Sequence, residues 1–171
     1  MVSKILVMGV SGCGKSTVAA HLASALNCKL IEGDDFHLPQ SKLKMRQGIP
    51  LGDEDRWPWL DRLGMLLAMP GESAVLTCSA LKRAYRDRLR AAVPGLKVVF
   101  IEISPEEAGA RVASRLGHLF PASLVASQFA ALESPVGEPG VFRVEAASAI
   151  EKQIGEVRDW LGQTAFAVSS P

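Results

Sequence analysis

The stretch G-V-S-G-C-G-K-S at residues 9–16 decides the fold of this chain of 171 residues. It fits the pattern G-x-x-x-x-G-K-[ST], in which glycines let backbone N–H groups turn inward around a phosphate. An apolar run at 4–8 predicts a strand before it, and apolar side chains recur at helical spacing over 16–26 after it. The sequence therefore predicts a phosphate-binding loop, with Lys15 at the β- and γ-phosphates of a nucleoside triphosphate and the Ser16 hydroxyl on Mg²⁺.

The phosphate loop does not by itself define the reaction, because GTPases, motor ATPases and small-molecule kinases share it. The N-K-x-D base reader of GTPases is missing from the sequence, which disfavours that class. Cys13 lies inside the loop, where a helix N-terminus can lower the pKa of a thiol. The simpler interpretation is that Cys13 is a small residue that fits the turn.

The pattern of a strand followed by a helix repeats along the rest of the chain. Further strands are predicted at 29–31, 74–78, 98–103 and 141–144, and further helices at 56–69, 82–92, 105–116, 123–132 and from about 148 to 161. Strands that are apolar almost throughout indicate a parallel sheet covered on both faces. We expect one α/β domain over 1–163, a doubly wound parallel sheet of about five strands with helices on both faces, followed by a loose tail at 164–171.

The composition disfavours several classes of partner. Nineteen basic and eighteen acidic residues give a net charge of +1, so no global charge favours nucleic acid or a membrane surface. The apolar stretches are far shorter than the roughly 20 residues that span a bilayer, and the N-terminus runs straight into a strand pattern. Three scattered cysteines without C-x-x-C spacing disfavour a disulfide framework and a zinc site. We expect a cytoplasmic protein with reduced thiols, without a nucleic-acid or membrane partner.

Acidic side chains crowd the end of the second predicted strand, in E-G-D-D-F-H-L-P at 32–39. In a doubly wound sheet, Glu32, Asp34 and Asp35 would lie in the crevice at the carboxyl ends of the strands, near the phosphate loop. A carboxylate there can orient Mg²⁺ through water, or accept a proton from an attacking hydroxyl, with His37 beside it. The alternative is a solvated acidic loop.

A basic segment, C-S-A-L-K-R-A-Y-R-D-R-L-R, follows at 78–90. A helical wheel places four basic residues on its polar face, Lys82, Arg83, Arg86 and Arg90. Arg88 falls in the apolar face, where an unpaired charge would be costly. We therefore expect Arg88 to reach an anion or a buried carboxylate, with extension to solvent as the alternative.

Two arginines precede a short segment bounded by glycine and proline, in R-V-A-S-R-L-G-H-L-F-P at 111–121. Arg111 and Arg115 are one helical turn apart and share a face. Arginines on a mobile lid, here about 115–122, can close over ATP and neutralise the charge of a transferring phosphoryl group. The alternative is a pair of surface arginines that only solvate a helix. With the acidic and basic segments, a lid predicts phosphoryl transfer to a small, polar, anionic acceptor that carries hydroxyls.

These segments resemble the gluconate kinase (gluconokinase) family. After the phosphate loop they appear in chain order as G-D-D-F-H, then K-M-x-x-G-x-P-L and D-x-D-R-x-P-W-L within 44–60, then C-S-A-L-K-x-x-Y-R-D-x-L-R, then R-x-G-H-L-F and S-Q-F-x-x-L-E-x-P within 115–135. The resemblance covers most of the chain from Gly9 to Pro135. It implies ATP-dependent phosphorylation of D-gluconate to 6-phospho-D-gluconate, a nucleoside-monophosphate-kinase-like P-loop fold with a mobile lid, Mg²⁺, and a homodimer.

The resemblance also implies roles for individual residues. The catalytic residues would be Lys15, Asp34 and Arg115. The ATP site would comprise Gly9, Ser11, Gly12, Cys13, Gly14, Lys15, Ser16, Thr17, Arg111 and Arg115. The acceptor side would comprise Asp34, His37, Lys44, Arg56, Lys82, Tyr85, Arg86, Arg88 and His118. Ser16 would ligate Mg²⁺ with Glu32 in its outer shell, although the family often has aspartate at Glu32 and usually reads V-D-I-D where this chain has V-E-A-A at 144–147.

Two other functions stay open at this point. A kinase of the same fold could act on shikimate, a nucleoside monophosphate or another sugar acid. A regulatory protein could bind a nucleotide without catalysis. Lys15, Ser16, Asp34 and the lid arginines are all present, which favours an active enzyme.

Overall fold

A single parallel sheet of five strands forms the centre of the computed structural model, which describes residues 2–116 and 122–167. The strands lie in the order β2-β3-β1-β4-β5. Their bounds are β1 (Lys4–Met8), β2 (Lys29–Glu32), β3 (Ala74–Thr77), β4 (Lys97–Glu102) and β5 (Val141–Glu145). The predicted doubly wound parallel sheet is confirmed.

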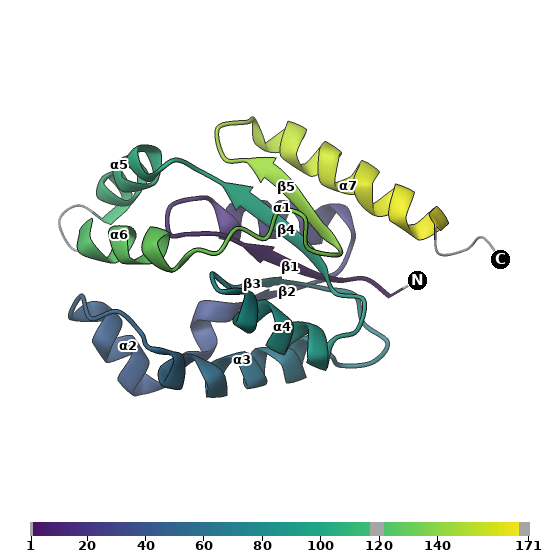
Figure 1. The fold of residues 1–171 in the computed structure, drawn as a ribbon. Helices are drawn as coiled ribbons and strands as arrows, with labels where there is room; N and C mark the ends of the chain where they lie inside the picture. Colours follow the sequence, from purple (N-terminus) through teal and green to yellow (C-terminus); the bar gives the residue numbers. More distant parts are fainter. Residues whose placement is uncertain (1, 117–121, 168–171) are drawn as a thin grey trace.

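Helices cover both faces of this sheet (Figure 1). Their bounds are α1 (Lys15–Ala25), η1 (Gly33–Phe36), α2 (Pro39–Arg46), α3 (Asp53–Leu67), α4 (Arg83–Ala92), α5 (Pro105–Leu116), α6 (Ala122–Ala131) and α7 (Ile150–Ala167). Helices α1 and α7 lie on one face, and α3 and α4 lie on the other. Within the described residues, no helix is both long enough and apolar enough to cross a membrane.

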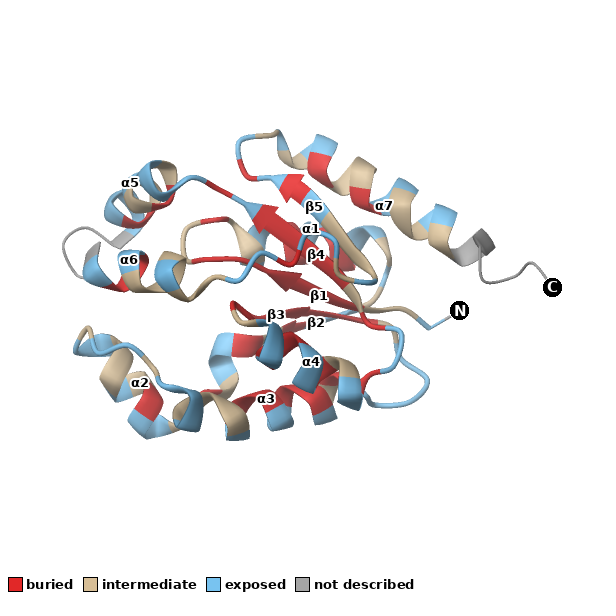
Figure 2. Cartoon of the chain, viewed as in Figure 1, coloured by how far each residue is buried: buried red, intermediate tan, exposed pale blue. Residues whose placement is uncertain are grey.

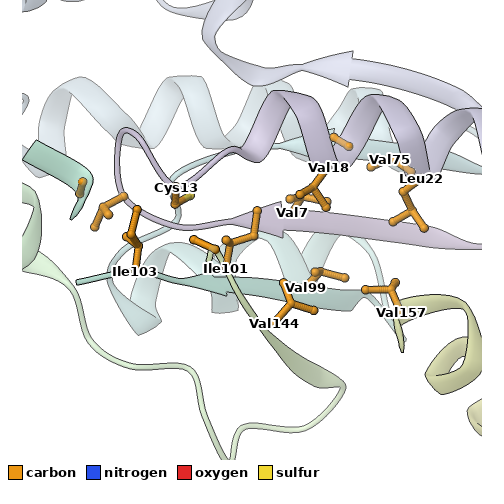
Figure 3. Close-up of a cluster of buried hydrophobic side chains, with 14 of the residues drawn as sticks. Val7, Cys13, Val18, Leu22, Val75, Val99, Ile101, Ile103, Val144 and Val157 are labelled. Carbon is orange, nitrogen blue, oxygen red and sulfur yellow. The ribbon is translucent and has the colours of Figure 1, made fainter. Parts of the chain in front are cut away.

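Each face of the sheet has its own apolar core, because successive strand residues point to opposite faces. Val7 and Val99 pack with Val18 and Leu22 of α1 and with Val157 of α7 (Figure 3). On the opposite face, the cluster that contains Leu6, Leu76 and Val98 packs against α3 and α4. The central strands are buried almost throughout, as Figure 2 shows, which explains why their sequences do not alternate between apolar and polar residues.

The register of the strands brings their carboxyl ends to one edge of the sheet. Glu32, the last residue of β2, lies opposite Thr77, the last residue of β3, and Val7 of β1 lies opposite the same Thr77. The phosphate loop, η1 and the turn before α4 all leave the sheet at this edge. The fold therefore gathers three chemically distinct loops that are far apart in the sequence.

The structure corrects three expectations. The segment after β2, for which no helix was predicted before 56, forms η1 and then α2, whose first residue, Pro39, has the fixed φ that suits a helix start. Helix α3 begins at Asp53 instead of 56, and the Gly52 N–H donates to the Asp55 carboxylate at 3.0 Å. Helix α7 runs to Ala167, so the tail predicted at 164–171 is helical at its start. The helix continues past Gly162, and Thr164 Oγ1 donates a hydrogen bond to the Leu161 carbonyl oxygen one turn earlier.

Candidate active site

The phosphate loop joins β1 to α1 and keeps a backbone conformation that requires glycine. Gly12 has a φ of 84°, and a Cβ added to it would lie 2.9 Å from the Ala108 carbonyl oxygen of α5. Lys15 Nζ donates to the carbonyl oxygens of Gly9 at 3.0 Å and Val10 at 3.1 Å. These two bonds hold the ammonium group against its own loop, which leads into the N-terminus of α1, a position that favours anion binding.

The Ser16 hydroxyl and the Glu32 carboxylate meet beside the loop. Ser16 Oγ donates to Glu32 Oε2 at 3.1 Å, and Thr77 Oγ1 donates to the same oxygen at 2.7 Å. A hydroxyl and a carboxylate are the oxygen ligands that Mg²⁺ prefers, and Mg²⁺ commonly completes its shell with water and substrate phosphates. In the part of the chain that the structure describes, no three His, Cys, Asp or Glu side chains gather as a metal cluster. The pair therefore fits Mg²⁺ held jointly with a nucleotide.

Cys13 is a packing residue of the phosphate loop. Its side chain belongs to the core between the sheet and α1, and the residue is 2 % exposed. Burial raises the pKa of the Cys13 thiol, and the nearby Lys15 charge offsets this effect only in part. The interpretation as a small residue that fits is confirmed, and an activated thiol is not.

Asp34 and His37 form a pair at the end of β2. His37 is 7 % exposed, and its ring stacks on Trp59 with centroids 4.0 Å apart. Its Nε2 lies 3.5 Å from Asp34 Oδ1, while the Asp34 side chain is 75 % exposed. The hydrogen bond from His37 is the largest cause that lowers the pKa of Asp34, and the charges of Lys15 and Arg56 lower it further. Asp34 is therefore an ionised carboxylate that His37 contacts on one side, while most of its side chain stays exposed.

Both the phosphate loop and this pair line one cavity of 320 Å³, here called the phosphate-loop cavity. Its polar lining residues are Ser11, Lys15, Ser16, Asp34, His37, Arg56, Ser79, Arg115 and Gln128. The expected proximity of the acidic segment to the phosphate loop is present in the structure. A phosphate oxygen and an acceptor hydroxyl can both be contacted in this space.

A second cavity of 620 Å³, here called the polar cavity, lies next to it. Lys44 Nζ donates to both Asp55 oxygens, at 2.8 and 2.9 Å. Lys82 Nζ donates to Asp53 Oδ1 at 3.0 Å, and the Tyr85 hydroxyl donates to the same oxygen. The hydrogen bond from Tyr85 and then that from Lys82 lower the pKa of Asp53. With Glu54 and Arg56, which also line it, the polar cavity has two lysines, an arginine, a tyrosine and three carboxylates, and such a lining suits a polar molecule with several hydroxyls.

Arg56 connects the two cavities. It lines both of them, together with Pro50, Leu51 and Gln128. Its guanidinium lies 5.4 Å from the centre of the Tyr85 ring. An acceptor that extends from the polar cavity to the phosphate loop can therefore place a negatively charged group near the Arg56 guanidinium.

The structure places Arg86 outside the cavities, contrary to its expected place on the acceptor side. Arg86 is 0 % exposed and donates to the carbonyl oxygens of Ala80, Leu81 and Glu133 and to the Glu138 carboxylate. The helical wheel placed Arg86 on the polar face of α4, but the chain segment after α6, which contains Glu133 and Glu138, covers that face at Arg86. A helical wheel describes one helix alone and cannot show that a distant segment packs on it.

Arg88 also lies away from the cavities. It reaches a carboxylate, but an exposed one, since Nε lies 2.7 Å and Nη2 2.8 Å from the two Asp61 oxygens and both side chains are about half exposed. Its guanidinium also lies over the Trp57 ring at 5.3 Å. Helix α3 therefore supplies the partner that was expected to be an anion or a buried carboxylate.

The two arginines of α5 have different surroundings. Arg115 lines the phosphate-loop cavity. Arg111 lines neither cavity and donates to the Glu107 carboxylate at 2.6 Å and to the Ala146 carbonyl at 3.0 Å. His118 and most of the predicted lid, 117–121, lie outside the described residues.

Gln128, a residue of α6 that lines both cavities, was not among the residues predicted for the site. The Ser11 N–H donates to Gln128 Oε1 at 2.7 Å, and Gln128 Nε2 donates to Ser11 Oγ at 2.9 Å. A single glutamine in an apolar helix carries no chemical signature in a sequence. Its position in the S-Q-F segment was the only hint, and its partner lies 117 residues away.

Comparisons with known proteins agree with this geometry. The chain matches the AAA domain family over residues 5–138. It is 39 % identical to the thermosensitive gluconokinase of Escherichia coli over 95 % of this chain and 87 % of that protein, and 47 % identical to the gluconokinase of Gluconobacter oxydans over 82 % and 80 %. A gluconokinase structure from Sinorhizobium meliloti superimposes with a TM-score of 0.91 at 42 % identity and covers 98 % of both chains. The APS kinase of Mycobacterium tuberculosis shares the fold, with a TM-score of 0.66 at 20 % identity.

Proposed function

This chain belongs to the gluconokinase family, and we propose that it transfers the γ-phosphoryl group of ATP to D-gluconate, forming 6-phospho-D-gluconate and ADP. The observation that carries this proposal is the shared lining of one cavity by Lys15 of the phosphate loop and Asp34 of the acidic segment. A phosphate donor and a hydroxyl acceptor can meet there. The polar cavity provides room for the rest of a six-carbon polyol acid.

Lys15 and the backbone N–H groups of its loop would bind the β- and γ-phosphates and stabilise charge that develops during transfer. Asp34 would accept a hydrogen bond from the attacking hydroxyl and take its proton as the new ester bond forms. His37 holds the Asp34 carboxylate in place through Nε2. Arg115 lines the same cavity and would neutralise charge on the transferring group.

The gluconate carboxylate would be recognised by the cations of the polar cavity. Arg56 lines both cavities, and Lys44 and Lys82 line the polar cavity alone. An arginine can bind a carboxylate with two parallel hydrogen bonds, so Arg56 is the strongest candidate for this contact. Tyr85, Asp53 and Asp55 offer donors and acceptors for the gluconate hydroxyls.

Ser16 and Glu32 would hold Mg²⁺, Ser16 directly and Glu32 in the outer shell. Bound there, Mg²⁺ would neutralise phosphate charge and orient the triphosphate. We also propose a cytoplasmic location, which rests on the composition of the sequence, and a homodimer, which rests on the family resemblance. Light scattering tests the dimer, and cell fractionation tests the location.

An acceptor panel tests the proposed reaction. The purified protein with ATP and Mg²⁺ is offered gluconate, other sugar acids, shikimate, AMP or buffer, and the release of ADP is followed. Turnover that depends on gluconate is expected. If another acceptor gave a kcat/KM at least tenfold higher than that of gluconate, that acceptor would be the substrate. If the protein bound ATP but turned over no acceptor, a regulatory role would be favoured.

A further inference from the structure

Gln128 links helix α6 to the phosphate loop through both atoms of its side-chain amide. Gln128 Oε1 accepts from the Ser11 N–H at 2.7 Å, and Nε2 donates to Ser11 Oγ at 2.9 Å. Both bonds are partly buried. A neutral carboxamide is well suited to this contact, because it offers one acceptor and one donor side by side.

The linked elements form two walls of the proposed site. Ser11, Gly12 and Lys15 line the phosphate-loop cavity, whereas Ser127 and Ala131, on either side of Gln128 in the sequence, line the polar cavity. Gln128 itself lines both. The bonds to Ser11 therefore fix the distance between the wall that would bind phosphate and the wall that would bind the acceptor.

We propose that Gln128 is a positioning residue, which acts through Ser11 to hold the phosphate loop and the α6 wall of the polar cavity in register for phosphoryl transfer. This inference rests on the proposed function. In-line transfer needs the reacting atoms about 3 to 3.5 Å apart, and a misplacement of about 1 Å can cost roughly 10²-fold in rate. Because Gln128 has both amide atoms bonded to Ser11, it affects the reaction through the loop and needs no direct contact with a reacting atom.

The side chain must also be uncharged. A glutamate at 128 could still accept a hydrogen bond from the Ser11 N–H, but its charge would lie next to the phosphate-loop cavity and repel a triphosphate. An alanine would leave the partly buried Ser11 N–H without its partner and would add no charge. Gln128→Glu and Gln128→Ala therefore separate the electrostatic effect from the positional one.

The test measures kcat, both KM values, ATP affinity and melting temperature for six proteins: the wild type, Gln128→Ala, Gln128→Glu, Ser11→Ala, the double variant Gln128→Ala with Ser11→Ala, and Gln163→Ala. Gln163→Ala is the matched control, because it removes the same amide from an exposed position on α7. We expect Gln128→Ala to lower kcat by about 10- to 100-fold while ATP affinity stays within about threefold. Gln128→Glu should instead raise KM for ATP by about tenfold or more.

The double variant separates positioning from a general structural role. Ser11→Ala removes only the bond to Gln128 Nε2 and leaves the Ser11 N–H bond to Oε1 intact, so its effect on kcat should be smaller than that of Gln128→Ala. If Gln128 acts through Ser11, loss of the Ser11 hydroxyl costs little once the amide is gone, so the double variant should have nearly the kcat of Gln128→Ala. Additive effects, or Gln128→Ala and Ser11→Ala proteins within twofold of the wild type in kcat, would overturn the inference. If Gln128→Ala does not fold, Ser11→Ala still tests the Nε2 contact. A wild type that does not phosphorylate gluconate would instead refute the proposed function.

Discussion

Arg86 and Glu138 form a buried, bidentate ion pair. Arg86 Nη2 lies 2.6 Å from Glu138 Oε1, and Arg86 Nε lies 3.0 Å from Glu138 Oε2. Arg86 also donates to the carbonyl oxygens of Ala80, which has a φ of 44°, and Leu81. The pair therefore joins the segment after α6 to the strained turn that leads Lys82 into the polar cavity.

Removal of Glu138 should destabilise the protein strongly. Glu138→Ala leaves the Arg86 charge buried without its carboxylate, which typically costs about 3 to 5 kcal/mol in free energy of unfolding. Urea denaturation measures the change. Arg88→Ala is the matched control, because it removes an exposed pair with Asp61 and should lower stability far less. Equal losses in the two variants would contradict the structural role of Arg86.

The same pair predicts a dependence on pH. Burial would raise the pKa of Glu138, but the hydrogen bonds from Arg86 and Arg90 outweigh it and hold the pKa below its ordinary value. A carboxyl group whose pKa is lowered by folding contributes stability above its unfolded pKa, about 4.3, and loses that contribution as the pH falls through the folded pKa. The difference in stability between the wild type and Glu138→Ala should therefore be constant at neutral pH and shrink below about pH 4. A difference that grows on acidification would contradict this assignment.

Replacement of Lys15 should abolish most turnover and leave the fold intact. Lys15→Ala removes the cation that would stabilise phosphate charge, and the loss of one preorganised donor commonly costs about 10²- to 10³-fold in kcat. Steady-state kinetics measures the loss, and circular dichroism checks the fold. Near-normal turnover would refute the assignment of the phosphate loop.

Asp34 should affect chemistry more than nucleotide binding. The carboxyl group of Asp34 is ionised at neutral pH, because its pKa is acidic to begin with and the hydrogen bond from His37 lowers it further, so it can accept a hydrogen bond from the attacking hydroxyl. Asp34→Asn removes this base, which should lower kcat by about 10²- to 10⁴-fold while ATP affinity changes little. A selective loss of ATP binding would place Asp34 on the nucleotide side of the cavity instead.

The buried thiols should resist alkylation in the native protein. Burial raises the pKa of Cys13, and it raises that of Cys78 to about 12. Cys28 is only partly buried. Peptide mapping after iodoacetamide treatment at pH 8 should show modification first at Cys28. Alkylation of Cys13 as fast as that of an unfolded peptide would contradict its role in packing.

The strand and helix order could be predicted from the sequence because each element carries a local pattern. The phosphate loop and the apolar strands of the sheet centre are local signals of this kind. The acidic end of β2 was predicted to face the phosphate loop, since parallel strands end at one edge of a sheet. Helix α2 was missed because its sequence, P-Q-S-K-L-K-M-R, has little apolar periodicity.

The misplaced arginines show what a single helix pattern cannot reveal. Arg86 is buried because a segment about 50 residues later in the chain covers it, whereas Arg88 is about half exposed and pairs with Asp61 of α3. Gln128 was overlooked for the same reason, since its partner Ser11 is distant in sequence. Contacts between elements decide these three side chains, and no local spacing encodes them.

The most direct test of the central claim is a phosphorus NMR time course of the wild-type protein with ATP, Mg²⁺ and gluconate, beside Lys15→Ala. In the wild type, the γ-phosphate signal of ATP should be replaced, one for one, by a phosphate ester coupled to the C6 protons of gluconate, and Lys15→Ala should form almost none of this ester. Release of inorganic phosphate with unchanged gluconate, or an ester at another carbon, would contradict the central claim.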